Sequence, residues 1–396
     1  MQLTNDQETA LKIILEKHKN NERYVVVSGY AGTGKSTLVR FAISALNVSE
    51  DKVAYCSYTG KAAEVLRKKG NKNAMTLHRL IYDSIPLPGG GYYHKPKERL
   101  DEYSIIVVDE VSMVPKSMIK LLLSYKVFVI FLGDPFQLPV IDKDEAHNLL
   151  DNPDIFLSEI MRQEAESEII QLTLKIRKGE IIKPYQGNEV IIIPKEELVT
   201  GHLLWADQVI CATNKTRAEL NNQMRKLLGY SGLPQNGEKM ICLHNYWADL
   251  SENNESPLVN GMTGIIKNPF ESFRIAPRYV KMRNHRMDNI TADFITDEND
   301  IYPGVEMDKV MIETGEPCLD WRESYALGKL IPKIGNIAPR YFTYGYAISA
   351  WKAQGSEWSK VTAIEERHPF DKIEHARYMY TVATRASDKL VLVLNN

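Results

Sequence analysis

The chain has 396 residues, of which 44% are hydrophobic and 25% are charged, and its formal net charge is −2. These values are ordinary for folded globular proteins, and the length favours two or three domains over one. A net charge so near zero excludes a global basic field, so a nucleic-acid partner would have to be held in a local groove.

Neither the apolar runs nor the cysteines indicate a membrane or secreted protein. No apolar run approaches the length needed to cross a bilayer, and the N-terminal stretch MQLTNDQETALKIILEKHKN is amphipathic and contains acidic residues, unlike a signal peptide. The four cysteines form no C-x-x-C pair, which disfavours disulfide and metal roles for Cys56, Cys211, Cys242 and Cys318. We therefore expect a cytoplasmic protein without membrane contact.

About the first 150 residues alternate between strand-like and helix-like segments after an amphipathic N-terminal helix. Strands are predicted at 24–28, 53–57, 104–108 and 127–132, and helices at 36–46, 60–69 and 115–124. This alternation is typical of a doubly wound parallel sheet. The stretch IPLPGGGYYHKPKE at 85–98 interrupts it.

The first loop of this sheet, GYAGTGKST at 29–37, fits the phosphate-loop pattern G-x-x-x-x-G-K-[ST] between a strand and a helix. Backbone N–H groups in such a loop and the helix N-terminus converge on phosphate oxygens. Lys35 is expected to reach the β and γ phosphates and Ser36 to bind Mg²⁺. The loop residues predicted to bind nucleotide are Gly32, Thr33, Gly34, Lys35, Ser36 and Thr37.

Two later strands end in polar residues at the same edge of the predicted sheet. YSIIVVDEVSM places Asp109 and Glu110 there, and FLGDPFQLP places Gln137. We expect Asp109 to hold Mg²⁺ and Glu110 to orient and deprotonate the attacking water. The amide of Gln137 is suited to detect a γ-phosphate or that water.

A second α/β segment follows. SEIIQLTLKIRKG suits a connecting helix, ADQVICATN is strand-like, and residues 215–228 are helical. The pattern resumes with YGYAISAW, SKVTAIEE, a helix near 373–385 and KLVLVL. Residues 236–340 have short β-like runs and many Pro, Gly and Asp residues, which indicates a β-rich insertion.

Together these motifs resemble superfamily 1 helicases, specifically the branch that contains RecD, the phage helicase Dda and their relatives. The resemblance runs from LTNDQETAL, which is similar to the glutamine motif, to YMYTVATRASDKLVLV. Between them stand, in family order, GYAGTGKST, SYTGKAAEVL, MTLHRLI, VVDEVSM, GDPFQLP, EIMRQEAES, CATNKTRAELN and YAISAWKAQGSEW. It implies two RecA-like doubly wound parallel-sheet lobes, 1–160 and 161–396. A small β-hairpin pin at about 83–100 would interrupt the first lobe, and an SH3-like domain at 236–340 the second.

The same resemblance implies further nucleotide contacts. Gln7 would read adenine, which favours ATP over GTP, and Arg162 and Arg385 would reach the γ-phosphate, where guanidinium groups stabilise developing charge. Gly355 and Glu357 would approach the phosphates and ribose.

Contacts with DNA, mostly with its phosphates, are implied at Thr59, Lys61, Thr76, His78, Thr213, Asn214 and Ser349. Hydroxyls and amides beside strand ends suit such contacts, which carry no base information. Capping of the following helices by the three threonines is an equally good role and can coexist with DNA contact.

Three features leave alternatives open. Trp351 stands where branch members often have histidine, and its indole either stacks on a base or packs in the protein. Tyr92 and Tyr93 either form the tip of the pin or lie in an exposed loop. The basic stretch FRIAPRYVKMRNHR either holds a DNA strand or forms a solvated face.

The sequence thus predicts an ATP- and Mg²⁺-dependent DNA helicase that moves 5′ to 3′ on single-stranded DNA, with the polarity implied by the branch alone. A translocase without strong unwinding and an ATP-switched DNA-binding module are the alternatives. The expected partners are single-stranded DNA, duplex junctions, and single-strand-binding or replication proteins. We expect a monomer from a bacterial or phage-infected cell.

Overall fold

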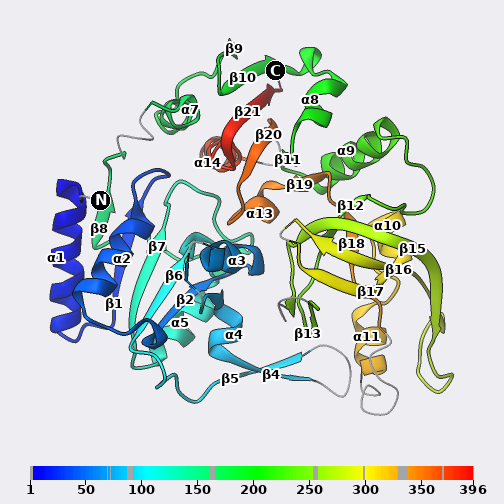
Figure 1. Cartoon of the computed structure of the whole chain (residues 1–396), viewed down its shortest axis with the longest axis horizontal. Coiled ribbons are helices and arrows are strands. Elements are labelled where there is room, and N and C mark those ends of the chain that lie inside the picture. The colour runs from blue at the N-terminus through cyan, green and yellow to red at the C-terminus, as the bar shows by residue number, and fades with distance from the viewer. Residues whose placement is uncertain are drawn as a thin grey trace. The chain divides into compact units, whose positions relative to one another are not determined.

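The computed structural model describes residues 3–68, 70–71, 73–86, 92–160, 166–252, 257–297, 299–328, 338–367 and 370–395. The chain divides into two compact units (Figure 1). Unit 1 comprises Met1–Ile81, Lys97–Arg217 and Ile348–Asn396, and unit 2 comprises Tyr82–Pro96 and Ala218–Ala347.

Unit 1 contains two α/β lobes, of which the first is built on a parallel sheet. In spatial order, its described strands are β3 (Met75–Thr76), β2 (Val53–Ser57), β6 (Ile105–Asp109), β7 (Phe128–Gly133), β1 (Tyr24–Gly29) and β8 (Ile155–Leu157). Its helices are α1 (Asn5–Lys19), α2 (Lys35–Ala45), α3 (Gly60–Lys68), α4 (Leu77–Ile81) and α5 (Lys116–Ser124). The strands are unbroken apolar runs because helices cover such a sheet on both faces. Its core includes Ile14, Leu38, Val25, Ile105 and Ile130.

The second lobe repeats this plan. In spatial order, its described strands are β19 (Ala347–Ser349), β11 (Gln208–Cys211), β20 (Trp358–Ile364), β21 (Ala386–Leu394), β10 (Val190–Pro194) and β9 (Tyr185–Gln186). Strands β11, β20, β21 and β10 pair in parallel, and β9 is antiparallel to β10. The helices of this part are α7 (Glu168–Arg177), α8 (Thr200–Trp205), α13 (Ala350–Ala353) and α14 (Lys372–Ala383), and α9 (Asn214–Leu227) begins here and continues into unit 2. The prediction of two doubly wound α/β lobes is therefore confirmed.

Unit 2 is dominated by an antiparallel sheet. In spatial order, its described strands are β17 (Ile301–Asp308), β16 (Arg286–Thr296), β15 (Thr263–Ile275), β12 (Lys239–Cys242) and β18 (Phe342–Tyr344). Two smaller hairpins pair β13 (Tyr246–Leu250) with β14 (Pro257–Leu258) and β4 (Tyr82–Pro86) with β5 (Tyr92–Pro96). Its helices are α10 (Lys309–Thr314) and α11 (Trp321–Gly328).

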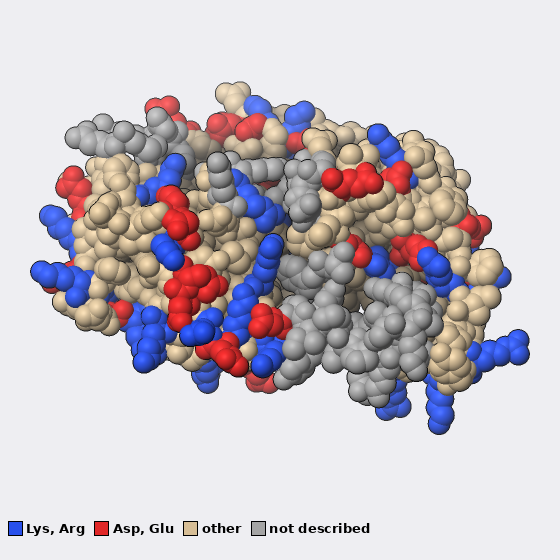
Figure 2. All heavy atoms as spheres, turned by 60° about the horizontal axis from the view of Figure 1, so that its bottom comes forward, with Lys and Arg blue, Asp and Glu red and all other residues tan. Residues whose placement is uncertain are grey.

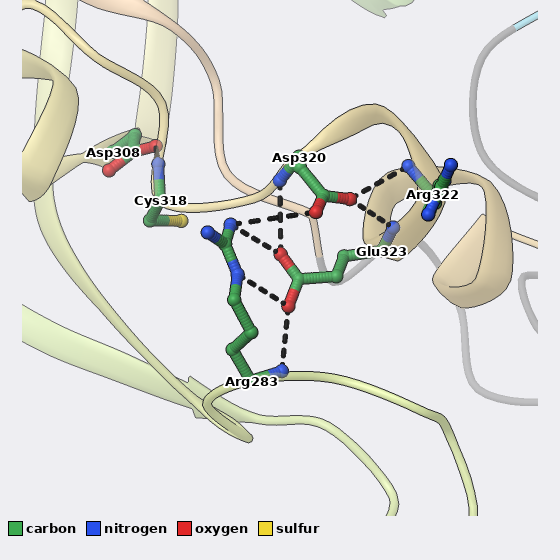
Figure 3. Close-up of polar contacts among 6 residues, drawn as sticks. All are labelled: Arg283, Asp308, Cys318, Asp320, Arg322 and Glu323. Atoms are coloured by element: carbon green, nitrogen blue, oxygen red, sulfur yellow. Dashed lines mark hydrogen bonds and ion pairs between the residues drawn. The ribbon is translucent and has the colours of Figure 1, made fainter.

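A carboxylate network fixes the part of unit 2 around α10 and α11 (Figure 3). Glu323 accepts hydrogen bonds from the backbone and the guanidinium of Arg283, at 2.7 to 3.2 Å, and from the backbone of Asp320 at 3.0 Å. Asp308 caps α10 through Met311 N–H and also accepts from the backbone of Cys318. These carboxylates therefore tie α11 and the segment before it to the loop between β15 and β16.

Ion pairs with carboxylates also involve the basic stretch at 273–286. Arg274 pairs with Glu306, Arg283 with Glu323, and Arg286 with Asp288. On the face drawn in Figure 2, Lys and Arg side chains lie among Asp and Glu side chains and form no single basic field. Three of the five Lys and Arg side chains of this stretch are thus paired with carboxylates, and contact of the stretch with a DNA strand stays a prediction.

Across the described ranges, no helix combines the length and the apolar character that a membrane span requires.

Candidate active site

The phosphate loop joins β1 to α2 as predicted. Gly32 and Gly34 have φ of +77° and +75°, in the left-handed region that glycine adopts without strain. This curl brings the Lys35 ammonium onto the loop's own carbonyls, 2.6 Å from Gly29 O and 2.9 Å from Tyr30 O. Thr33 is buried and donates to Tyr30 O. Lys35 therefore lies over the loop, where it is suited to meet phosphate.

Gln7 holds the first helix against this loop. Thr4 and Gln7 form a reciprocal capping box at the start of α1, and the Gln7 side chain is buried. Gln7 Nε2 donates to Thr33 O at 3.2 Å. The structure therefore brings the predicted adenine-reading residue into direct contact with the phosphate loop.

Asp109 ends β6 beside the loop, and Glu110 follows it. Ser36 and Asp109 line one cavity of about 180 Å³, and a hydroxyl with a carboxylate is an oxygen donor set that Mg²⁺ accepts. These residues therefore fit the predicted metal. Glu110 has a φ of +53°, a strained value for a residue with a side chain, and its N–H donates to Asp109 Oδ1. Thr37, also predicted to bind nucleotide, is half-buried in the first turn of α2.

Gln137 lies in the loop after β7, which we call the 134–139 loop. Its side chain is buried, and its Oε1 has no hydrogen-bond partner among the described residues. Asp134 at the start of this loop is also buried and accepts from Phe136 N–H through Oδ1. Burial raises the pKa of the Asp134 carboxyl, while the charge of Lys35 opposes that rise.

Residues of the second lobe form hydrogen bonds with the 134–139 loop. Thr381 Oγ1 accepts from Leu138 N–H at 3.0 Å, and Gln354 Nε2 donates to Leu138 O at 2.8 Å. The Trp351 indole donates to Pro139 O at 3.3 Å, and its ring lies 5.8 Å from that of Phe370. The structure therefore gives Trp351 packing contacts, and its stacking on a base stays a prediction.

The predicted arginines and the residues of KAQGSE have different placements. Arg162 lies outside the described residues. Arg385 is buried, and its guanidinium donates to Thr381 O, Ser356 O and Thr384 Oγ1 within its own lobe. Gly355 lies close to α3 of the first lobe, since a Cβ there would be 2.5 Å from Ala62 Cβ, whereas Glu357 is exposed. The described contacts do not bring Arg385 to the phosphate loop.

The three threonines predicted to contact DNA cap helices. Thr59 Oγ1 accepts from Ala62 N–H, and Thr76 Oγ1 accepts from Arg79 N–H. Thr213 Oγ1 accepts from Thr216 N–H. Capping is thus established for all three, and DNA contact stays a prediction.

The remaining predicted DNA contacts are more varied. Lys61 is buried, and the His78 ring lies 5.6 Å from that of Tyr58. Asn214 is exposed at the start of α9, and Ser349 is half-buried before α13. The backbone of 92–93 lies in β5, but the side chains of both tyrosines lie outside the described part of the structure.

Sequence reasoning missed one cation beside the phosphate loop. The Arg177 guanidinium, at the end of α7, lies 3.4 Å from the centre of the Tyr30 ring. The Tyr30 ring in turn meets Phe156 edge to face at 5.2 Å. Arg177 ends the helix predicted from SEIIQLTLKIRKG, but no short-range signal links it to Tyr30.

Comparison with known proteins gives two family matches. A family model described as an AAA domain matches residues 2–191, and one described as a UvrD-like helicase C-terminal domain matches residues 344–393.

Two curated relatives have the same sequence identity to this chain. The ATP-dependent RecD2 DNA helicase of Deinococcus radiodurans is 26% identical over 375 residues, which is 93% of this chain and 46% of that protein. The ATP-dependent DNA helicase dda of Enterobacteria phage T4 is 26% identical over 255 residues, 57% of each chain. The chain spans about half the length of these relatives.

Among solved structures, the Pif1 helicase from Bacteroides in complex with ADP-AlF3 and single-stranded DNA aligns with a TM-score of 0.54 at 18% identity. The alignment covers 99% of this chain and 92% of that chain. Pif1 helicase from Candida albicans gives 0.51 at 18% identity, covering 100% of this chain and 95% of that chain. These structural similarities concern the fold of the chain alone.

The two sheets and the phosphate loop define a P-loop nucleotide-binding protein with two RecA-like lobes. The matches to RecD2, to dda and to the two family models show what the chain is similar to. It is similar to superfamily 1 helicases of the Pif1, RecD and Dda type, as its motifs predicted.

Proposed function

We propose that this chain is an ATP-dependent DNA helicase that moves 5′ to 3′ on single-stranded DNA and separates the duplex ahead of it. The observation that carries the proposal is the bonding of the 134–139 loop, which holds Gln137, to Thr381 and Gln354 of the second lobe. Such a loop can pass a change at the γ-phosphate to that lobe. The relatives named as ATP-dependent DNA helicases support the reaction, and the branch supports the polarity.

In the proposed ATP site, Lys35 and the loop N–H groups bind the phosphates and Gln7 reads adenine. Ser36 and Asp109 hold Mg²⁺, which neutralises phosphate charge when bound. Glu110 orients the attacking water and takes its proton, and Gln137 detects the γ-phosphate.

Further residues complete the proposed ATP site from the second half of the chain. We propose that Arg162 and Arg385 stabilise charge in the transition state and that Gly355 and Glu357 lie near the phosphates and ribose. Arg385 would have to exchange its carbonyl partners, Thr381 O and Ser356 O, for phosphate.

The DNA path follows the predicted phosphate contacts at Thr59, Lys61, Thr76, His78, Thr213, Asn214 and Ser349. The hairpin of β4 and β5 is the proposed pin, with Tyr92 and Tyr93 at its tip end. The proposed domain arrangement is a first lobe at 1–160 that carries this pin and a second lobe at 161–396 that carries an SH3-like domain at 236–340. The proposed motor is a cytoplasmic monomer, and single-strand-binding or replication proteins are its proposed partners.

The decisive experiment measures unwinding of one duplex with either a 5′ or a 3′ single-stranded tail, in the presence of ATP and Mg²⁺. Opening from the 5′ tail alone is expected. Opening from the 3′ tail alone would refute the polarity. ATPase activity that single strands stimulate, without opening of either duplex, would establish a translocase instead. An ATPase indifferent to single strands would indicate an ATP-switched binding module.

A further inference from the structure

The hydroxyl of Tyr380, near the end of α14, contacts two loops of the first lobe. It donates a hydrogen bond to Asp134 Oδ2 at 2.5 Å and accepts one from the backbone N–H of Ala31 at 2.9 Å. Ala31 lies in the phosphate loop, and Asp134 begins the 134–139 loop. One hydroxyl of the second lobe therefore joins both loops on which the proposed ATP chemistry depends.

The burial of this contact makes it costly to lose. Tyr380 is 0% exposed and Asp134 is 1% exposed. A buried carboxylate is stable only when it is hydrogen-bonded, and hydrogen bonds to charged groups are among the stronger ones. Because Asp134 Oδ1 already accepts from Phe136 N–H, the hydroxyl of Tyr380 fixes the carboxylate that shapes the turn. The rings of Phe136 and Tyr380 also meet edge to face at 5.4 Å.

We propose that Tyr380 is a positioning residue that couples occupancy of the phosphate loop to the docking of α14. The N–H groups of a phosphate loop donate hydrogen bonds to bound phosphate. The Tyr380 hydroxyl accepts a hydrogen bond from one N–H group of the same loop. A movement of Ala31 N–H therefore alters the hydrogen bond that the Tyr380 hydroxyl accepts. The buried tyrosine cannot shift without α14, whose last residues lead into Arg385.

The chain supplies a matched control two residues away. Tyr378 lies on the same helix and is 0% exposed, but its hydroxyl donates to Ile364 O within the second lobe. Tyr380→Phe and Tyr378→Phe therefore each remove one buried, hydrogen-bonded hydroxyl and leave the ring. Only the first removes the connection to the phosphate loop.

The first readout is hydrogen exchange of the full chain with and without a non-hydrolysable ATP analogue. In the wild type and in Tyr378→Phe, the analogue is expected to slow exchange in 29–37 and in 372–383. In Tyr380→Phe, the response of 29–37 should persist while that of 372–383 falls by at least half. An equal response of 372–383 in both variants would overturn the proposal, as would a wild type in which this segment does not respond.

The second readout is steady-state ATPase activity, and this part rests on the proposed function. Tyr380→Phe should lower DNA-stimulated kcat about tenfold with less than a threefold change in KM for ATP, because a buried hydrogen bond to a charged group is lost. Tyr378→Phe should keep wild-type kcat. Equal kcat values in the two variants would refute the coupling.

The two hypotheses fail in different ways. A wild type without DNA-stimulated ATPase contradicts the proposed function, yet the exchange experiment still tests the coupling. If Tyr380→Phe does not fold, Asp134→Asn replaces it, because an amide keeps the shape and weakens the hydrogen bond. A partial loss of the 372–383 response is then expected, and a full wild-type response would overturn the proposal.

Discussion

Replacing Gly355 with alanine should destabilise the protein by about 2–5 kcal/mol, through two separable terms. Gly355 has a φ of +76°, where a residue with a side chain costs roughly 1–2 kcal/mol. The added Cβ would also lie 2.5 Å from Ala62 Cβ and 3.3 Å from Thr59 Oγ1 of the first lobe. Carbon atoms pack at about 3.5–4.0 Å, so this overpacking adds roughly 1–3 kcal/mol.

Gly179 is the matched control for the backbone term. Its φ is +70°, and a Cβ at this position would meet nothing within 4 Å. Gly179→Ala should therefore cost roughly 1–2 kcal/mol, the backbone term alone. The difference between the two variants isolates the close approach of the loop after α13 to α3.

Urea unfolding followed by tryptophan fluorescence measures the free energy of unfolding of both variants, provided that their m-values match that of the wild type. The transition of Gly355→Ala should lie at clearly lower urea than that of Gly179→Ala. Its ATPase rate should also fall, because the added methyl group pushes the KAQGSE loop away from α3. Equal midpoints in the two variants would refute the close approach.

Glu110→Gln should lower ATP turnover at least 100-fold with nucleotide binding retained, because the proposed base loses its basicity; an ATPase assay paired with a fluorescent-nucleotide titration tests this, and an active variant would remove that assignment. Gln7→Ala should raise the KM for ATP several-fold, since its bond to Thr33 O is lost, and reduce the preference over GTP, since the proposed adenine contact is lost; an unchanged ratio of the two KM values would contradict the adenine-reading role. Hydrogen bonds from Arg283 lower the pKa of Glu323 from 4.5 to about 2, so its stabilising effect is complete above pH 4.5 and lost as pH falls toward 2. Glu323→Gln should therefore cost about 1 kcal/mol at pH 7, a value limited by the exposure of Arg283, and the gap in urea midpoint should narrow between pH 5 and pH 3; a constant gap would argue against the ion pair.

Local patterns predicted the first lobe well because its chemistry lies within short segments. The phosphate loop is nine consecutive residues, and the strands before Asp109 and Gln137 are unbroken apolar runs that the structure places within one residue of the predicted ranges. Parallel strands bring their carboxyl ends to one edge. The position of each motif along the chain was therefore enough to place Lys35, Asp109 and Gln137 after the carboxyl ends, or at the carboxyl end, of the neighbouring strands β1, β6 and β7.

Contacts between the lobes could not be predicted in this way. Tyr380 and Asp134 are 246 residues apart, and neither stretch contains a pattern that selects the other as partner. The sequence left base stacking and packing open for Trp351 because an indole serves both, and no local pattern predicts its contacts with the carbonyl of Pro139 and the ring of Phe370. The contact of the Arg177 guanidinium with the Tyr30 ring is likewise visible only in the tertiary structure.

Thr213 shows how a local inference can leave the ligand undetermined. The family resemblance implies that a DNA phosphate meets Thr213 at the start of α9. In the structure the carboxylate of Glu366 accepts from Thr213 N–H at 3.0 Å, from Thr213 Oγ1 at 2.9 Å and from Thr216 Oγ1 at 2.6 Å. An anion is therefore present, supplied from 153 residues away. A DNA phosphate could bind these donors only by displacing Glu366, so contact with DNA at Thr213 requires an exchange of anions that no local pattern reveals.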